Sequence, residues 1–265
     1  MLKLLENIGR LTTRVCAEIW DMLSLLAQTL YWMIVGPFKK KAVKRQGIFH
    51  QMVFTGIQSV IIVFFVAIFT GIVIAMQSAY QLAQLGATVY VAGLVSVSIC
   101  RELGPVLTSL VIAGRVGAAI TAEIGTMRVS EQVEALEAMA LNPVRFLVVP
   151  RFLALVIMLP CLTALADLSG IAGGYLVGVF NLNLDPNLYM DTTFRFLEAK
   201  DVLTGIFKSL VFGIIIALVA CHQGLNTKGG AEGVGKSTTV SVVTSFILII
   251  LADVVLTGAF YFSDM

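Results

Sequence analysis

The sequence predicts an all-α integral membrane protein, in which an N-terminal interfacial amphipathic helix precedes five transmembrane helices. Charged residues make up only 13% of the 265 residues and hydrophobic residues 58%, with a mean hydropathy of +0.94, whereas soluble domains carry about 25% charged residues. Residues 51–100 contain no charged side chain. Because a backbone in lipid must satisfy its own hydrogen bonds, we expect the apolar segments to be helices.

The first 35 residues carry one apolar stripe with helical spacing. Its members are Leu4, Ile8, Leu11, Val15, Ile19, Met22, Leu26 and Leu30, and charged residues lie off this stripe. This pattern is typical of a helix lying in the membrane interface. A cleaved signal peptide is disfavoured, because acidic residues interrupt the early region and no small-residue cleavage site follows. We therefore divide the chain into an interfacial helix with a basic cytoplasmic linker (1–46) and a transmembrane domain (47–265).

Five segments reach the roughly 20 apolar residues that cross the hydrocarbon core. They are Met52–Met76, about Val89–Gly114, Phe152–Phe180, Val202–Ala220 and Val240–Phe262. In the second we expect Gly104-Pro105 to bend the helix, because proline lacks a backbone donor. In the third, Gly170, Gly174 and Gly178 share one face, which indicates tight helix packing within or between subunits.

Positive charges are unevenly placed between these segments. Lysine and arginine gather before the first, between the second and third, and between the fourth and fifth, at Lys39, Lys40, Lys41, Lys44, Arg45, Arg115, Arg128, Arg145, Arg151, Lys228 and Lys236. The opposite-side segments hold only Arg195 and Lys200. The positive-inside rule therefore predicts a cytoplasmic N-terminus and an external C-terminus.

Residues 229–239 read GGAEGVGKSTT, and Gly230, Gly235, Lys236 and Ser237 fit the phosphate-binding pattern G-x-x-x-x-G-K-[ST]. A working phosphate loop joins a buried strand to a helix within a soluble α/β layer, and here a membrane span lies on each side. We interpret the stretch as a flexible loop in which Ser237 or Thr238 caps the last helix. The chain is not expected to hydrolyse ATP itself.

Charges within the spans are costly and mark a partner or a wet cavity. Four lie well inside them: Arg101, Glu102, Lys208 and Asp253. They form either an ion-pair cluster that fixes helix packing or a path for a charged headgroup. Asp167 adds a fifth charge to which no partner can be assigned. The four cysteines are widely spaced and form no C-x-x-C motif, so we predict packing roles and no metal site.

The loop between spans two and three predicts a short helix. Ser130 is expected to cap it, and Asn142-Pro143 to end it after Leu141. One flank is acidic (Glu131, Glu134, Glu137) and the other apolar (Val133, Leu136, Met139, Ala140). Such a helix is either a solvated connector or an element that docks into a groove on a cytoplasmic partner.

The block RELGPVLTSLVIAGRVGAAITAEIGTMRVSEQVEALEAMALNPVRFLVVPR, residues 101–151, resembles the MlaE/YrbE-type permeases of bacterial ABC lipid transporters (Mla/MCE systems). The stretch GAEGVGKSTTVSVV resembles the same family's loop before its last span. This resemblance implies a homodimeric permease in the bacterial inner membrane that moves phospholipid and maintains outer-membrane lipid asymmetry. The implied partners are an ABC ATPase subunit that binds ATP and Mg, a STAS-domain protein and a periplasmic MCE-domain lipid carrier, with no cofactor on this chain and no nucleic acid.

By the same resemblance, residues of about 123–141 form the coupling helix that enters the ATPase, with contact candidates Glu123, Arg128, Glu131 and Glu134. The resemblance also implies an outward-facing lipid cavity at Ile74, Gln77, Gln81, Leu82, Arg101 and Leu103. A lipid carrier needs an apolar cavity with a polar rim, because exposing acyl chains to water costs about 0.8 kcal/mol per CH₂. The alternative is a self-sufficient secondary transporter or channel that uses the buried charges as an ion relay, although the five spans show no inverted repeat.

Overall fold

The computed structural model describes the backbone of residues 2–38 and 45–263 and the side chains of residues 17–35 and 46–260. The described residues form helices and no strand. Five helical segments are long and apolar enough to cross a membrane: Gln46–Ala83, Thr88–Val129, Val144–Phe180, Ala199–Leu225 and Gly230–Phe260, called spans one to five below. The predicted all-α class and the five spans are thus confirmed. The basic linker residues 39–44 lie outside the described residues.

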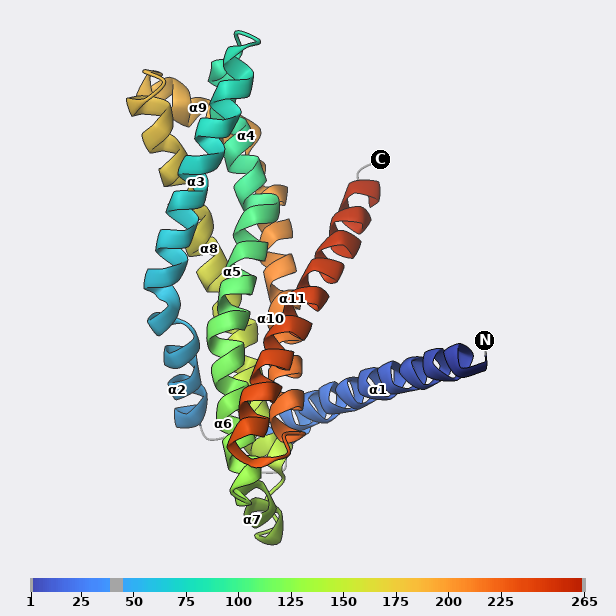
Figure 1. Cartoon of the computed structure of the whole chain (residues 1–265). Coiled ribbons are helices and arrows are strands. Elements are labelled where there is room, and N and C mark those ends of the chain that lie inside the picture. The colour runs from blue at the N-terminus through green and yellow to red at the C-terminus, as the bar shows by residue number, and fades with distance from the viewer. Residues whose placement is uncertain (1, 39–44, 264–265) are drawn as a thin grey trace.

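The five spans stand side by side as an elongated bundle (Figure 1). Span one consists of α2 (Arg45–Thr55), a 3-10 turn and α3 (Val60–Ala83). A short helix, α7 (Gln132–Ala138), lies at one end of the bundle, and α9 (Pro186–Phe196) lies at the other. We call these two ends the α7 end and the α9 end.

Span two is not a uniform α-helix. Its parts are α4 (Val91–Ser98), a π-helical segment Ile99–Leu103, α5 (Gly104–Ile112), a second π-helical segment Ala113–Gly117 and α6 (Ala118–Val129). The first π-helical segment ends directly before Gly104-Pro105, and Gly104 N–H donates to the carbonyl of Ile99. The helix therefore continues through the proline, and the wider π-helical turn before Pro105 accommodates its missing N–H donor. π-helical segments are frequent at functional sites.

The glycines that share one face of span three pack against other helices of the same chain. Span three contains α8 (Val149–Phe180), which packs along α3. A Cβ atom on Gly71 of α3 would overlap the carbonyl of Gly170, and a Cβ on Gly174 or Gly178 would meet the side chain of Tyr189 in α9. Small residues let these backbones approach closely.

Spans four and five are α10 (Ala199–Leu225) and α11 (Gly230–Ser263). Thr121 of α6 joins them, because its hydroxyl lies 2.8 Å from Ser241 Oγ and 3.1 Å from the Ala220 carbonyl. The prediction of a flexible loop capped by Ser237 or Thr238 is wrong. The helix already begins at Gly230, and Thr238 Oγ1 donates to the carbonyl of Val234 inside it.

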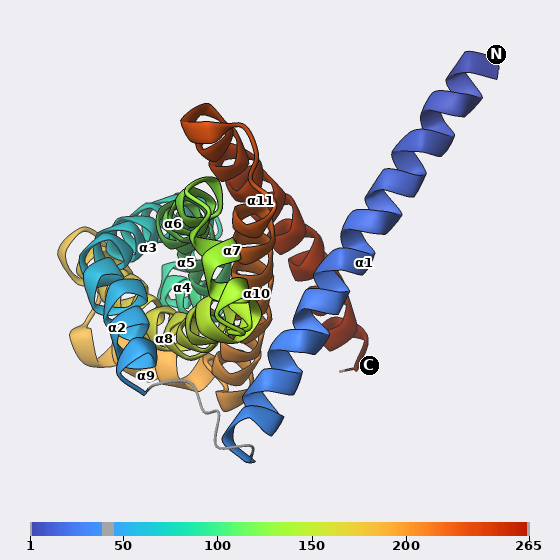
Figure 2. The ribbon, with the colours of Figure 1, turned by 90° about the horizontal axis from the view of Figure 1, so that it is seen from below.

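The N-terminal helix, α1 (Leu2–Phe38), projects sideways from the bundle near the α7 end, and its N-terminal part extends beyond the other helices (Figure 1 and Figure 2). Its second half packs against α8 and α10. Met22 and Leu26 of the predicted stripe pack on the core, as Leu25 and the buried Thr29 do. Ile19 and Leu30 of the same stripe are exposed, so the packed face is rotated from the predicted one.

The helix predicted over 130–141 is shorter in the structure and starts differently. Ser130 Oγ donates back to the carbonyl of Thr126 in α6, so Ser130 does not cap α7. The reversal occurs instead at Glu131, which has a left-handed φ of 60°. Ala140, with φ 56°, ends the helix, and Leu141 N–H donates to the Leu136 carbonyl.

Candidate functional site

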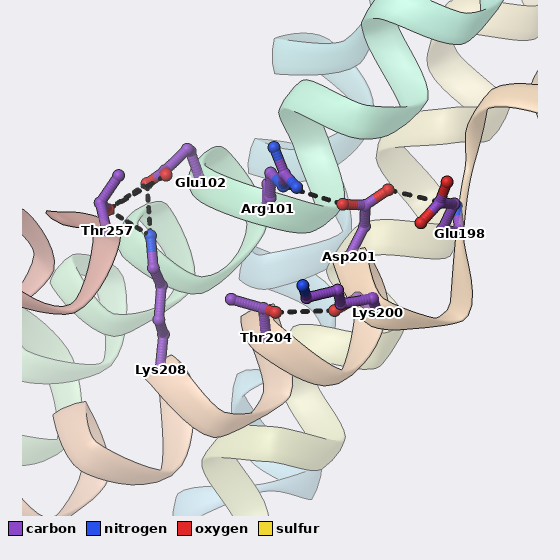
Figure 3. A network of polar contacts seen from close by, with 8 residues as sticks. All are labelled: Arg101, Glu102, Glu198, Lys200, Asp201, Thr204, Lys208 and Thr257. Carbon is purple, nitrogen blue, oxygen red and sulfur yellow. Dashed lines mark hydrogen bonds and ion pairs between the residues drawn. The ribbon is translucent and has the colours of Figure 1, made fainter. Parts of the chain in front are cut away.

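Two neighbouring charges of span two leave the first π-helical segment in different directions. Arg101 and Glu102 lie next to each other in the π-helical segment Ile99–Leu103, and successive residues of a helix point in different directions around its axis. Figure 3 shows Glu102 directed to α11 and α10, and Arg101 directed to the start of α10. The four predicted charges therefore do not form one cluster.

Glu102, Lys208 and Asp253 form an ion-pair network that joins spans two, four and five (Figure 3 shows the first two). Lys208 Nζ donates to Glu102 Oε2 at 2.6 Å and to Thr257 Oγ1 at 2.7 Å, and Thr257 donates to Glu102 Oε1 at 3.1 Å. Asp253 Oδ1 lies 2.9 Å from Lys208 Nζ as an ion pair without hydrogen-bond geometry. The Lys208 side chain is only 1% exposed, so the network supplies the partners that a buried ammonium requires.

Arg101 pairs with a residue outside the predicted set. Its Nε lies 2.8 Å from Asp201 Oδ1. Asp201 also accepts from the backbone N–H of Glu198 at 3.1 Å and belongs to the capping box that starts α10. Arg101 therefore ties the π-helical segment of span two to the first turn of span four.

A small polar cavity lies between these two ion-pair systems. Its volume is about 60 Å³, and its lining residues are Arg101, Glu102, Lys200, Thr204, Lys208, Thr257 and Phe260. This space is enough for water molecules, which need roughly 10–15 Å³ each, and too small for a phospholipid. The cavity lining holds three cations (Arg101, Lys200, Lys208) and the carboxylate of Glu102, and Asp201 and Asp253 pair with Arg101 and Lys208 from outside the lining.

The residues expected to line a lipid cavity lie along the outer half of α3 and in span two. Ile74 and Leu82 are half-buried against α4, whereas Gln77 and Gln81 are exposed. Leu103 lines a separate apolar cavity of about 20 Å³ between α3, α5 and α8. Arg101 lines the small polar cavity described above, so Arg101 and Leu103 lie in different cavities.

Asp167 of α8 is buried beside Gly104, with 4% exposure. Neither of its carboxylate oxygens has a hydrogen-bond partner among the described residues. A buried polar group of this kind is rare. Asp167 does not join the network of Lys208, and the structure gives it no polar contact that would define a role.

The acidic flank of α7 faces outward. Glu131 and Glu134 are exposed, whereas Val133 and Leu136 are buried against Leu147. Val133 and Leu136 therefore hold α7 on its own chain, whereas Met139 and Ala140 of the predicted apolar flank are exposed.

The four residues expected to contact an ATPase are placed differently from one another. Glu134 Oε1 lies 2.5 Å from Arg128 Nη1 across the α6–α7 turn. Glu123 Oε1 lies 2.9 Å from Arg151 Nη2 of α8, whose side chain is 5% exposed. Glu131 stands at the turn itself. The structure thus brings Arg128, Glu131 and Glu134 to one surface and directs Glu123 to span three.

Some polar contacts were not predicted from the sequence. Arg115, in the second π-helical segment, donates to Ser59 Oγ at 2.5 Å, where the 3-10 turn interrupts span one. Thr257 and Asp201 complete the two ion-pair systems described above. In the sequence, the only sign of the contact between Arg115 and Ser59 is that an arginine stands within an apolar run. The interruption of span one has no such sign.

Comparisons with known proteins agree with this architecture. Residues 48–259 match the family described as Permease MlaE. The chain is similar to a probable ABC transporter permease protein of Rickettsia bellii, with 40% identity over 98% of this chain and 99% of the relative. It is 44% identical to a probable ABC transporter permease protein of Synechocystis over 80% of each chain.

A plant protein is also similar. The chloroplastic protein Trigalactosyldiacylglycerol 1 of Arabidopsis thaliana is 35% identical over 80% of this chain and 61% of its own length. The match of the family to most of the chain, together with relatives aligned over nearly its full length, establishes the class. The chain belongs to the MlaE permease family and is a permease subunit of an ABC transporter.

Proposed function

We propose that this permease carries phospholipid in an ATP-driven transporter, between the bacterial inner membrane and a periplasmic MCE-domain lipid carrier, and so maintains outer-membrane lipid asymmetry. The proposal of an ATP-driven transporter rests on α7, in which Val133 and Leu136 pack on the chain itself while Glu131, Glu134 and Met139 beside them remain exposed. A helix presented in this way suits docking into a groove of a basic partner. That partner is the ABC ATPase subunit, which would hold ATP and Mg, while this chain binds no cofactor.

The proposed orientation places the α7 end in the cytoplasm and the C-terminus in the periplasm. Arg128, Arg145, Arg151 and Lys228 belong to the segments at or near the α7 end, and positive charges prefer the cytoplasmic side. A cytoplasmic α7 is also a condition for contact with an ATPase. The α9 end, with Gln77 and Gln81 on the same half of α3, then faces the periplasm and an MCE-domain carrier.

Lipid as the cargo is supported by the exposed apolar surface of α3 and by one relative. Ile61, Phe65, Phe69 and Val73 are exposed along α3, and Gln77 and Gln81 follow near its outer end. An apolar wall with an amide rim suits acyl chains and a headgroup. The Arabidopsis relative is named after a diacylglycerol lipid.

A homodimer would complete the lipid space. Arg101 and Leu103 line two different small cavities, and Gln77 and Gln81 are exposed. A second copy that covers the exposed faces of α3 and α11 would supply the missing wall. The STAS-domain protein would bind the ATPase subunit rather than this chain.

The alternative, an ion-coupled transporter or channel that works alone, is not favoured. Lys208 is enclosed by Glu102, Asp253 and Thr257, which suits a fixed packing contact between three spans. The family relatives are named as ABC transporter permeases, which work with a separate ATPase.

Transport in proteoliposomes tests the proposal. The permease, alone or with its ATPase subunit, is reconstituted, and the passage of a fluorescent phospholipid to a soluble MCE-domain acceptor is followed with and without ATP. We expect passage only with the ATPase subunit and ATP. Passage driven by a proton or sodium gradient in the permease alone would establish the alternative instead.

A further inference from the structure

A large cavity lies at the α7 end, far from the Lys208 network. Its volume is about 750 Å³, within the range of about 300–1,000 Å³ typical of ligand sites. It lies between the start of span one, the end of α6 and the start of span three. Its polar wall is formed by Gln46, His50, Gln51, Glu123, Asn142, Arg145 and Arg151.

Two arginines give this cavity a net positive charge. Arg151 is held by Glu123 at 2.9 Å and donates to the Leu147 carbonyl at 2.8 Å. Arg145 stacks on the ring of Trp32 in α1, 5.8 Å from its centroid, and no carboxylate among the described residues pairs with it. The positive charges of Arg145 and Arg151 and the negative charge of Glu123 sum to one positive charge. The planar guanidinium of Arg145, which has no carboxylate partner among the described residues, has the geometry that binds phosphate.

The hydrogen bonding of the wall is incomplete. Arg151 Nε and Gln51 Oε1 are buried and have no hydrogen-bond partner among the described residues. Buried polar groups in folded proteins are nearly always paired. These two atoms lie behind the surface of the cavity rather than on it, so the polar group that the cavity offers to a ligand is Arg145.

The remaining wall is apolar. Met127, Phe146, Leu147 and Pro150 line the same cavity, and Phe146 is 54% exposed. The cavity is therefore basic on one side and apolar on the other, at the ends of three spans. Basic pockets between transmembrane helices on the cytoplasmic side bind anionic lipid headgroups.

We propose that this cavity holds the headgroup of an anionic glycerophospholipid, such as phosphatidylglycerol, from the leaflet at the α7 end. Arg145 binds the phosphate, and the glycerol backbone and first methylenes lie against Phe146 and Met127. That this leaflet is cytoplasmic rests on the proposed orientation, but the binding itself does not. The site is separate from the proposed transport cavity near α3, so the lipid held here is not cargo. It links α2, α6 and α8 next to α7.

Other occupants fit the charges less well. The basic segment Lys39–Arg45 of this chain would bring like charges to Arg145 and Arg151. An acidic segment of the ATPase subunit would match the charge but would not use the apolar wall at Phe146. This second occupant is an outcome of the test.

Lipid binding to the delipidated full chain in a neutral detergent tests the proposal. The probes are dihexanoyl phosphatidylglycerol, dihexanoyl phosphatidylcholine and glycerol 3-phosphate, and the readouts are the Kd and the rise in Tm. The variants are Arg145→Gln and Arg145→Lys, with Lys228→Gln as the matched control because Lys228 is an exposed charge in another loop. The Tm of each variant without lipid shows that it is folded.

We expect saturable binding of phosphatidylglycerol that Arg145→Gln weakens at least tenfold, Arg145→Lys weakens less, and Lys228→Gln changes less than twofold. Phosphatidylcholine and glycerol 3-phosphate should bind at least tenfold more weakly than phosphatidylglycerol. Equal binding of both lipids, equal binding of glycerol 3-phosphate, or an unchanged Kd in Arg145→Gln would overturn the proposal. Loss of lipid binding when the ATPase subunit is added would show that a protein contact, and not the lipid, occupies this cavity in the assembled transporter, and would overturn the proposal. Lipid transfer is not a readout here, so failure of this site leaves the proposed transport function standing.

Discussion

Lys208 and Glu102 are 106 residues apart in the chain, and their side chains meet at 2.6 Å within the membrane-spanning bundle. Asp253 completes the contact from span five. A charge buried in a span requires such partners. The network therefore fixes the relative position of spans two, four and five at one level.

Replacing Lys208 by methionine should strongly destabilise the protein. The change keeps the length of the side chain and leaves Glu102 and Asp253 facing each other without a cation. Removal of one partner from a buried ion pair costs about 3–5 kcal/mol. Thermal unfolding in detergent should show a clear fall in Tm for Lys208→Met.

Two companion variants define the cause. The triple variant Lys208→Met, Glu102→Gln, Asp253→Asn should recover much of the Tm, because it leaves no unpaired charge. Asp253→Ala alone should lower Tm less than Lys208→Met, since Glu102 still neutralises Lys208. An unchanged yield and Tm in both Lys208→Met and Asp253→Ala would show that the network does not stabilise the fold.

The contact between Gly71 and Gly170 predicts a second stability effect. Gly71→Ala would place a methyl group on the carbonyl of Gly170 and push α3 away from α8, at a cost of about 1–3 kcal/mol. Gly235→Ala is the matched control, because nothing lies within 4 Å of its added Cβ. Because Gly235 is exposed within a helix, Gly235→Ala should raise the free energy of unfolding by up to about 1 kcal/mol. Equal Tm values for the two variants would mean that α3 and α8 are not packed as described.

The end of α7 predicts a stabilising substitution. Ala140 has φ 56°, a left-handed conformation that costs an L-residue with a side chain about 1–2 kcal/mol. Ala140→Gly should therefore strengthen the protection of α7 amides in hydrogen exchange. Ala135→Gly, in the middle of the same helix, should weaken it by about 1 kcal/mol. The same direction of change in both variants would contradict the assigned end of α7.

Tyr189 predicts a loss of stability at alkaline pH. Burial raises the pKa of the Tyr189 hydroxyl, outside the membrane spans, from 10.0 to about 12. The unfolded chain then loses the proton at a lower pH than the folded chain, so stability falls as pH rises from about 10 to about 12. Tyr189→Phe should make unfolding less dependent on pH in this window. The measurement is the free energy of unfolding in urea at pH 9 and pH 11, for the unchanged protein and for Tyr189→Phe. An equal change between the two pH values in both proteins would mean that the Tyr189 hydroxyl is accessible to water.

Sequence reasoning located the spans because long apolar runs depend on local composition alone. It made most of them too short: Gln46–Ala83 extends beyond the predicted Met52–Met76 at both ends, and Gly230–Phe260 starts before the predicted Val240. The helix Pro186–Phe196 was missed, although Asp185 before Pro186 is a recognisable helix start: its carboxylate accepts from Asn187 N–H at 2.8 Å. This signal could have been found.

The partners of the buried charges could not be predicted in the same way. Lys208 and Asp253 were recognised as charges in apolar runs, but their meeting depends on how spans four and five are rotated. The direction of Arg101 depends on the π-helical segment Ile99–Leu103, which the apolar pattern of the sequence does not distinguish from an α-helix. The glycines at 230 and 235 suggested a loop, whereas packing of α11 against α6 and α10 makes them helical.

The central claim is that a separate ATPase drives this permease through the exposed acidic face of α7. ATP hydrolysis and phospholipid transfer by the reconstituted complex, compared between Glu131→Lys and the control Glu232→Lys, test it most directly, because Glu232 is an exposed acid in α11. We predict that Glu131→Lys lowers both rates at least tenfold and weakens binding of the ATPase subunit, while Glu232→Lys changes neither by more than twofold. Full ATPase binding and lipid transfer in Glu131→Lys would contradict the account.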